Sequence, residues 1–452
     1  MKYLDFVFPA LFPFYQPHIF DAGRSWLLIL LKKSKIAYHA ALGLSCYYFT
    51  MALSDAGDIW ELAACKQLRW KEVEQESEKC FASLRAEIVA ITASIENAPT
   101  PILDKVELMN SITQVIVFEM TMGKAAPWNT HLPAAMSLFE DIMSHPGSVP
   151  IYRGRLQNKF ASVLLGLGEP SWTNPWPSNH IWSPIQAGFR FYAGLLIFVD
   201  IIASTATGQM PRLQSYHEDI LATNDEAVSL AGEAKVRLSN IVGCPNWVAS
   251  SIASISALTA REQTQTIPSD SCASRVGIIG RYAGIKQELD EGIAALKAGP
   301  TASTSPDANK NGSSDLIPLA SDPKSSNSSS FALVWALATR LYLSAILNKS
   351  AQGEPCTQAD IAHVLVLIKH VQPNRLRSLA WPIFVAGCLA PNVHQSSFGT
   401  LLAGLSSTDA VGALSDVHQM LKQVWTFRER HSDHEMDITG CFAVLGSPIL
   451  LI

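Results

Sequence analysis

Apolar positions recur every three to four residues along most of the chain, which is the spacing of one face of an α-helix. Between Trp70 and Glu96, for example, Val73, Cys80, Leu84 and Ile88 follow this spacing, while Glu and Lys fill the opposite positions. No run in the sequence alternates apolar and polar residues as a half-buried strand would. The pattern therefore predicts an all-α fold.

The same spacing predicts helices over residues 36–53, 70–96, 103–122, 128–142, 187–208, 219–238, 246–258, 278–296, 331–347 and 361–371. Gly208 is expected to end the helix 187–208 in a left-handed cap, because Pro211 follows and cannot continue the helix. Residues 169–184 are rich in Pro, Trp, Ser and Asn and predict an irregular connection.

One further helix, Leu379–Ala390, is apolar on every side, and it contains Pro382 and small residues that allow close approach. A helix of this kind needs a shell of other helices to cover it. It is too short to cross a bilayer, and Arg375 and Arg377 precede it. We therefore expect a core helix here. The apolar run 36–53, which contains His39 and follows three lysines, is better explained as a second core helix than as a membrane span.

Composition changes abruptly over residues 299–330, where Ser, Pro, Asn, Asp, Thr and Gly dominate. So little apolar surface cannot offset the entropy of ordering the chain. We expect a disordered insertion that divides one helical domain into a first part, residues 1–298, and a second part, residues 331–452. The second part is too apolar to stand alone and needs the earlier helices.

The overall balance is rich in core residues, with 48% hydrophobic and 16% charged residues among 452. The 34 Lys and Arg against 39 Asp and Glu leave a net charge of -5, which is unlike a nucleic-acid-binding surface. The eight cysteines are scattered singly, without a C-x-x-C pair, and most have apolar neighbours, as buried thiols in a reducing compartment do. The first residues lack the basic start of a signal peptide, so we expect an intracellular protein.

Several stretches together resemble the fungal-specific transcription factor regulatory domain of the acriflavine-sensitivity-control type. They are Trp128–Ala135, Phe189–Tyr192, Asp200–Ser204 with Gly208 and Pro211–Leu213, Gly243–Trp247, Leu379–Ala390 and the terminal Leu450–Ile452. The resemblance spans nearly the whole chain in the family's order, and each stretch is mainly packing chemistry. It implies a large helical regulatory body and a role in transcription in the fungal nucleus.

The family's regulatory domain normally follows a zinc cluster with two C-x2-C-x6-C motifs, whereas the first cysteine of this sequence, Cys46, stands alone. We therefore expect no direct specific DNA contact from this chain alone and no membrane association. Other transcription-regulatory proteins are the expected partners, with a homodimer and a small-molecule effector left open. A search for an upstream exon that encodes six cysteines would distinguish a truncated gene model from a regulator without a cluster.

Isolated polar residues were weighed as candidates for chemistry. Asp200 lies in an apolar helix, where an unpaired carboxylate is costly, so we expect a structural partner such as Arg190 or a helix N-terminus. His131 is interpreted as a helix-entry or core histidine rather than a ligand. Gly166 and Gly168 lack the third glycine and the preceding strand of a nucleotide-binding loop.

Two acidic groups are the remaining candidates. His431, Asp433, His434, Glu435 and Asp437 carry metal-ligand atoms, yet their polar surroundings predict a solvated loop.

Asp225, Ser229 and Glu233 lie four residues apart on a predicted helix face and resemble the second magnesium motif of class I terpene synthases. No D-D-x-x-D motif stands upstream to face them, so an ordinary exposed helix face is preferred.

The sequence thus predicts an all-α, large irregular bundle of stacked helices, and the resemblance implies that it regulates transcription, with a metabolic or secondary-metabolite gene cluster as a target. We predict no enzyme activity and no cofactor, and we assign no catalytic, cofactor-binding, metal-binding or DNA-binding residue. Two alternatives stay open: an accessory interaction protein that has lost DNA binding, and a terpene-synthase-like helical enzyme.

Deleting residues 299–330 should leave the thermal midpoint nearly unchanged, because this composition supplies no core. Differential scanning calorimetry of the deletion variant and the parent chain measures the effect. A drop of several degrees would show that the segment packs against the fold.

Overall fold

The computed structural model describes residues 2–17, 23–55, 60–95, 101–123, 128–145, 158–175, 178–223, 234–264, 272–298, 323–348, 354–430 and 437–452. The first helices are η1 (Tyr3–Val7), α1 (Phe8–Leu11), α2 (Ser25–Lys33), α3 (Lys35–Asp55), α4 (Trp60–Ile95), α5 (Ile102–Met122), α6 (Trp128–Ser144), α7 (Lys159–Gly166) and α8 (Pro184–Thr207). The central turns and helices are η3 (Gln214–Tyr216), α9 (His217–Ile220), η4 (Leu238–Asn240), α10 (Asn246–Thr264) and α11 (Cys272–Ala298). The last are α12 (Pro323–Leu347), α13 (Pro355–Ile368), α14 (Pro373–Leu376), η6 (Arg377–Leu379), α15 (Ala380–Cys388), α16 (Asn392–Ala403), α17 (Ala413–Arg430) and α18 (Ile438–Phe442).

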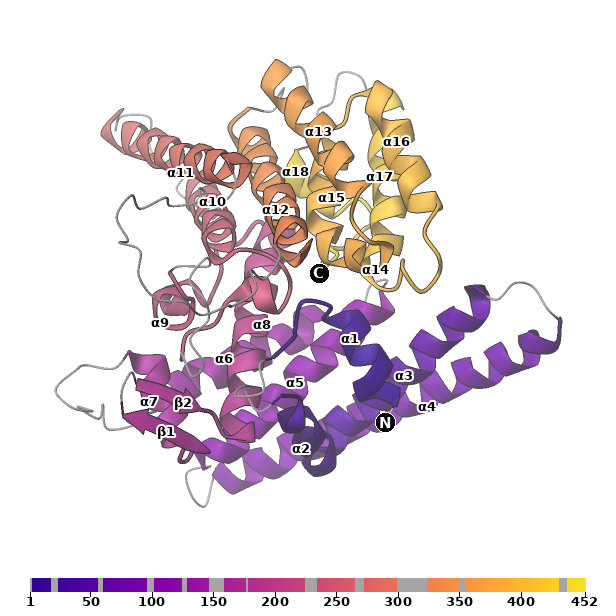
Figure 1. The fold of residues 1–452 in the computed structure, drawn as a ribbon, viewed down its shortest axis with the longest axis vertical. Helices are drawn as coiled ribbons and strands as arrows, with labels where there is room; N and C mark the ends of the chain where they lie inside the picture. Colours follow the sequence, from indigo (N-terminus) through magenta and orange to yellow (C-terminus); the bar gives the residue numbers. More distant parts are fainter. Residues whose placement is uncertain are drawn as a thin grey trace, which may run out of the picture.

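The predicted all-α class is confirmed by this succession of helices. In Figure 1 the N-terminal helices α1–α7 occupy the lower half, and α10–α18 occupy the upper half. Helix α8 lies between them and packs against α2, α5 and α6 on one side and against α10 and α18 on the other. A capping box of Ser183 and Gln186 begins α8, and Gly208 ends it with the expected left-handed conformation at φ 67°.

The core-helix prediction for Leu379–Ala390 is confirmed by α15. Each of its residues is buried, and α12, α13, α17 and α18 pack around it. Gly387 permits the close contact with α17, because a Cβ atom there would lie 2.6 Å from Leu421 Cδ1. The expected shell of helices is therefore present, and the small residue Gly387 lies at the close contact with α17.

A stacked tryptophan pair fixes α15 against its neighbours. The rings of Trp381 in α15 and Trp335 in α12 are nearly parallel, with centroids 5.7 Å apart. The indole N–H of Trp381 donates to Thr205 Oγ1 of α8 over 2.9 Å. Three helices from distant parts of the sequence therefore meet at one buried indole.

Helices α3 and α4 form a long pair whose far end extends beyond the body in Figure 1. Val73, Cys80 and Leu84 of α4 are buried as the spacing predicted. Ile88 is 42% exposed, so the buried stripe does not reach it and the prediction for this residue is wrong. An apolar stripe on a helix is buried only where another helix packs against it, and spacing alone does not show where that contact ends.

The helix predicted over residues 219–238 is wrong at both described ends. Leu221 and Val236 pair as a parallel β-bridge, and α9 ends at Ile220. The amide of Asn246 donates to the carbonyls of Ala222 and Val236, and its oxygen accepts from Leu238 N. This buried side chain satisfies backbone groups that a helix would otherwise pair internally.

The irregular connection predicted over residues 169–184 contains a small antiparallel sheet. Strand β1 (Trp172–Pro175) pairs with β2 (Ser178–Ile181), with Trp172 opposite Ile181. Of the predicted insertion 299–330, residues 299–322 lie outside the described residues. Helix α12 begins at Pro323, eight residues before the predicted boundary. The division into residues 1–298 and 331–452 stays a prediction, although α12 packs against α10 and α11 across it.

Two of the described helices are long and apolar enough to cross a membrane by length and composition, namely Pro184–Thr207 and Ser329–Leu347. In the fold, 89% and 61% of their most apolar windows are buried in protein. Such burial is typical of core helices, and α3, which covers the apolar run 36–53, is not among the two.

Replacing Trp381 by Ala should lower the free energy of unfolding by roughly 3–5 kcal/mol, because the surrounding helices cannot close the cavity. Trp70→Ala is the control, since Trp70 is 39% exposed. Chemical denaturation of both variants measures the difference. An equally small loss of unfolding free energy in both variants would show that α15 does not hold the core together.

Candidate functional site

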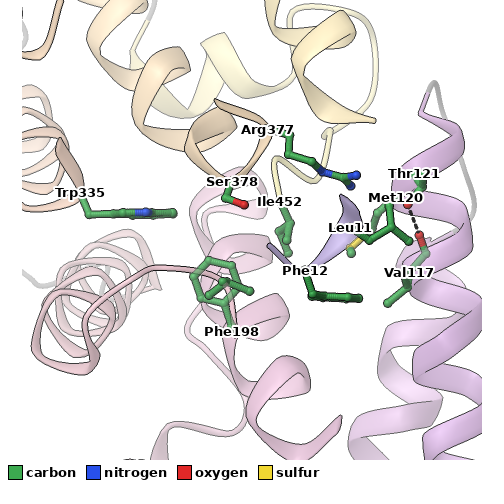
Figure 2. Close-up of a pocket in the computed structure, with 11 residues that line it drawn as sticks. Leu11, Phe12, Val117, Met120, Thr121, Phe198, Trp335, Arg377, Ser378 and Ile452 are labelled. Carbon is green, nitrogen blue, oxygen red and sulfur yellow. Dashed lines mark hydrogen bonds between the residues drawn. The ribbon is translucent and has the colours of Figure 1, made fainter. Parts of the chain in front are cut away.

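An internal pocket lies where the two halves of the molecule meet (Figure 2). Phe12 follows α1, Val117 belongs to α5 and Phe198 belongs to α8, and together with Ile452 they form apolar walls. The pocket leaves about 30 Å³ for the centres of water-sized molecules, which is room for about two of them. It is therefore a small, largely apolar cavity that joins distant segments.

Four polar side chains line the same pocket: Thr121, Trp335, Arg377 and Ser378. Trp335 is 1% exposed, and its indole N–H has no acceptor among the described residues. Within the described ranges, no residue forms an ion pair or hydrogen bond with Arg377. Desolvation by burial lowers the pKa of the Arg377 guanidinium to about 10, so it stays a cation at neutral pH.

The local sequence explains how these groups reach the pocket. Pro373 begins the short helix α14, and the single turn η6 then leads into α15. Leu376 and Leu379 point into the core, which leaves Arg377 and Ser378 between them at the pocket. Trp335 lies on the opposite side of the pocket from Arg377 in Figure 2. Its ring stacks on that of Trp381.

A second, wider cavity of about 630 Å³ is open to the surface along α3. Apolar residues such as Leu42, Phe49 and Leu53 line it, together with the cations Lys2 and Arg69. The Lys2 ammonium lies 5.0 Å from the Phe49 ring centroid, and Arg69 pairs with Glu72 over 2.6 Å. The groove is large enough for an apolar ligand or side chains of a partner.

Asp200 has a structural role, as expected, but the suggested partner Arg190 is wrong. Asp200 accepts from the backbone N–H of Arg212 at 3.2 Å and of Leu213 at 2.8 Å, just before the turn η3. Arg190 instead donates to the carbonyls of Ala234 and Lys235. The other expected partner of Asp200, a helix N-terminus, fits better, because Leu213 is the N-cap of η3.

His131 is a packing and pairing residue of α6. Its Nδ1 lies 2.9 Å from Glu119 Oε1, and its ring stacks on Phe81. Gly166 ends α7, and the Gly168 carbonyl accepts a hydrogen bond from the Gln186 side chain. The two glycines therefore belong to the connection after α7 and not to a nucleotide-binding loop.

The two acidic candidate groups lie mostly outside the described residues. This holds for Asp225, Ser229 and Glu233 and for His431, Asp433, His434 and Glu435. Asp437 is described, and it caps α18 by accepting from Gly440 N over 2.7 Å. Across the described ranges, no group of three or more His, Cys, Asp or Glu is arranged to hold a metal ion.

Sequence reasoning missed the polar pocket residues and one cysteine contact. Arg377 was noted only as a cation before the core helix, and Trp335 carried no signal beyond its apolar neighbours. Cys388 and Cys441 were treated as single thiols, yet their side chains hydrogen-bond in the core. Most of the described cysteines are buried, as expected, namely Cys80, Cys244, Cys388 and Cys441, whereas Cys65 and Cys356 are exposed.

Buried carboxylates in this fold serve as structural partners. Asp200 binds backbone amides, and Asp360 receives two hydrogen bonds from Arg340 at 2.6 and 2.8 Å.

Comparison with known proteins identifies the family. The model of the fungal specific transcription factor domain matches residues 1–442, and the chain belongs to this family. The resemblance found in the sequence is thereby confirmed, and the chain is a fungal transcription regulator.

The relatives are transcription factors or transcription regulators by name. Transcription factor dibT of Pestalotiopsis microspora is 32% identical over 100% of this chain and 70% of its own length. Pestheic acid cluster transcriptional regulator 3 of Pestalotiopsis fici is 26% identical over 96% of this chain and 71% of its own length. Trichothecene biosynthesis transcription regulator TRI10 of Trichoderma arundinaceum is 22% identical over 95% of this chain and 91% of its own length. No solved structure matches the chain significantly.

Asp200 should make stability depend on pH between about 4 and 6. Desolvation raises the pKa of this carboxyl from 3.8 to about 6, outweighing its two backbone hydrogen bonds. The folded state therefore keeps a proton that the unfolded state has released, and stability falls as pH rises through this window. The loss should reach about 2–3 kcal/mol.

Asp200→Asn should remove this part of the pH dependence and gain stability relative to the parent as pH rises from 4 to 7. Ser204→Ala, one turn along α8, should shift stability equally at every pH, because the Ser204 hydroxyl does not titrate in this range. Urea unfolding at each pH measures both. An unchanged slope in Asp200→Asn would mean that Asp200 ionises normally.

Proposed function

We propose that this chain is the regulatory part of a regulator that acts in the fungal nucleus on the genes of a biosynthetic cluster, through other regulatory proteins and without enzyme activity. The observation that carries the proposal is the match of the regulatory-domain family to residues 1–442. The names of the relatives supply the biosynthetic setting.

Charge supports action through partners rather than through DNA contact by these residues. Many cations are neutralised within the fold, as Arg340 is by Asp290 and Asp360 and as Lys33 is by Glu107. The net charge of -5 leaves little attraction for phosphate.

The structural hydrogen bonds of the buried polar groups support the absence of enzyme activity. The candidates for chemistry, Asp200 and His131, are engaged with backbone amides and with Glu119. Groups held in this way serve the fold, and a general acid or base must instead face a substrate.

The test is a fusion of residues 1–452 to an unrelated DNA-binding domain in a fungal reporter strain. We expect reporter output to change, whereas the purified unfused chain should give no site-specific complex in a gel-shift assay. The DNA-binding domain alone and the fused Trp381→Ala variant are the controls, because the latter keeps the surface and loses core stability.

An inert fusion that is expressed and folded would contradict the regulatory role. Tight, sequence-dependent binding by the unfused chain would contradict action through partners. The two results therefore test separate halves of the proposal.

A further inference from the structure

Two cysteine side chains from distant parts of the sequence are in contact inside the core. Cys388 is the last residue of α15, and Cys441 lies in α18, which packs against α15 in the upper half of Figure 1. Both side chains are fully buried, and a hydrogen bond joins their sulfur atoms. Sulfur atoms in such contact need only small side-chain rotations to form a disulfide, in which they lie about 2 Å apart.

The surrounding contacts hold the two cysteines at this place. Phe384 of α15 and Phe442 of α18 pack with their ring centroids 4.8 Å apart. From α17, the Arg428 Nη1 donates to the Cys388 carbonyl. The Arg428 Nη2 donates to the Cys441 sulfur over 4.0 Å. One guanidinium therefore contacts both cysteines and places a positive charge beside the Cys441 sulfur.

The two thiols differ in how readily they ionise. The pKa of the Cys441 thiol is lowered from its ordinary value, first by the hydrogen bond from Cys388 and then by the Arg428 cation. Burial and the Asp437 carboxylate oppose this shift only in part. Burial and the hydrogen bond instead raise the pKa of the Cys388 thiol. Because the thiolate is the form that reacts with oxidants, Cys441 is the reactive member of the pair.

Two other cysteines of the fold have surroundings that keep them protonated. Burial and Glu72 raise the pKa of the Cys46 thiol to about 11. Burial and Glu119 raise the pKa of the Cys80 thiol to about 12. An acidic neighbour disfavours the thiolate, whereas Cys441 has a cation and a second thiol as neighbours.

We propose that Cys388 and Cys441 form a reversible disulfide when hydrogen peroxide oxidises the chain, and that this bond links α18 covalently to α15. Both sulfur atoms are buried, so the oxidant has to be small. Hydrogen peroxide is uncharged and close to water in size. Helix α18 has only five residues, and a local opening of so short an element admits such a molecule.

The reaction has two steps. The Cys441 thiolate attacks one peroxide oxygen and the O–O bond breaks, which gives a sulfenic acid on Cys441 and a hydroxide that takes up the thiol proton as water. The Cys388 sulfur then attacks the Cys441 sulfur, the S–O bond breaks, and the Cys388 proton leaves with the hydroxyl group as a second water. Two thiols are oxidised to one disulfide, and one hydrogen peroxide is reduced to two waters.

The bond would stabilise the folded body. It closes a long loop between α15 and α18 and so restricts the unfolded chain. Helix α18 also packs against α8 and α12, so the link acts where the two parts of the chain meet. In a nucleus, where thiols are normally kept reduced, the disulfide would be a response to peroxide. This nuclear setting rests on the proposed function, whereas the bond itself does not.

The test uses the purified chain of residues 1–452, reduced and then treated with hydrogen peroxide. Remaining thiols are blocked with iodoacetamide in denaturant before digestion with trypsin, which cleaves between the two cysteines at Arg428 and Arg430. The unreduced digest should contain a linked pair of peptides, one with Cys388 and one with Cys441. The oxidised chain should unfold several degrees above the reduced chain. Because this assay needs no reporter, its failure is distinct from failure of the proposed function.

Variants assign the role of each group. Cys388→Ala should stop the oxidation of Cys441 at the sulfenic acid, which dimedone traps, and should abolish the rise in thermal midpoint. Arg428→Gln should slow formation of the link severalfold, because the cation beside the Cys441 sulfur is lost. The double variant Cys65→Ser and Cys356→Ser removes two exposed thiols and should form the link like the parent. The peptide map of the parent needs no variant, so it decides the question even if a core substitution unfolds the chain.

The proposal is overturned if Cys388 and Cys441 both carry the iodoacetamide label after peroxide has oxidised the exposed Cys65 and Cys356. Disulfides confined to the exposed cysteines would have the same meaning. A sulfinic acid on Cys441 without a link to Cys388 would also contradict it, because the second thiol would then not reach the first.

Discussion

The stack of Trp335 on Trp381 is the contact on which the rest of the structure depends. It joins α12 to α15, and the hydrogen bond from Trp381 to Thr205 joins both to α8. Helix α8 in turn carries the N-terminal helices on its other side. The same stack positions one wall of the internal pocket.

Much of the helical fold could be predicted from spacing alone, because amphipathic stripes and the fully apolar helix are local signals. The core position of Leu379–Ala390 and the cap at Gly208 followed directly from residue types. The bridge between Leu221 and Val236 could not be predicted, since its backbone groups also pair with the side chain of Asn246, which lies outside the segment 219–238. The helical spacing over 219–238 therefore gave a wrong prediction, because the side chain of Asn246 pairs with backbone groups that a helix would pair internally.

The candidate site was much less predictable than the fold. Its residues come from separate helices, and what makes Arg377 notable is a missing partner, which no sequence pattern records. For Asp200 the cost of burial correctly implied a partner, but spacing suggested Arg190 when nearby backbone amides were available. Residue chemistry predicts that a buried charge needs compensation, and three-dimensional packing decides which group supplies it.

The central claim is that α8, α12 and α15 form one cooperative core that unites both parts of the chain. Native-state hydrogen exchange tests it most directly, because it gives the opening free energy of each helix separately. The account predicts that buried amides of the three helices exchange through a single opening whose free energy equals that of global unfolding. Opening of α12 and α15 at a clearly lower free energy, with α8 still protected, would contradict it.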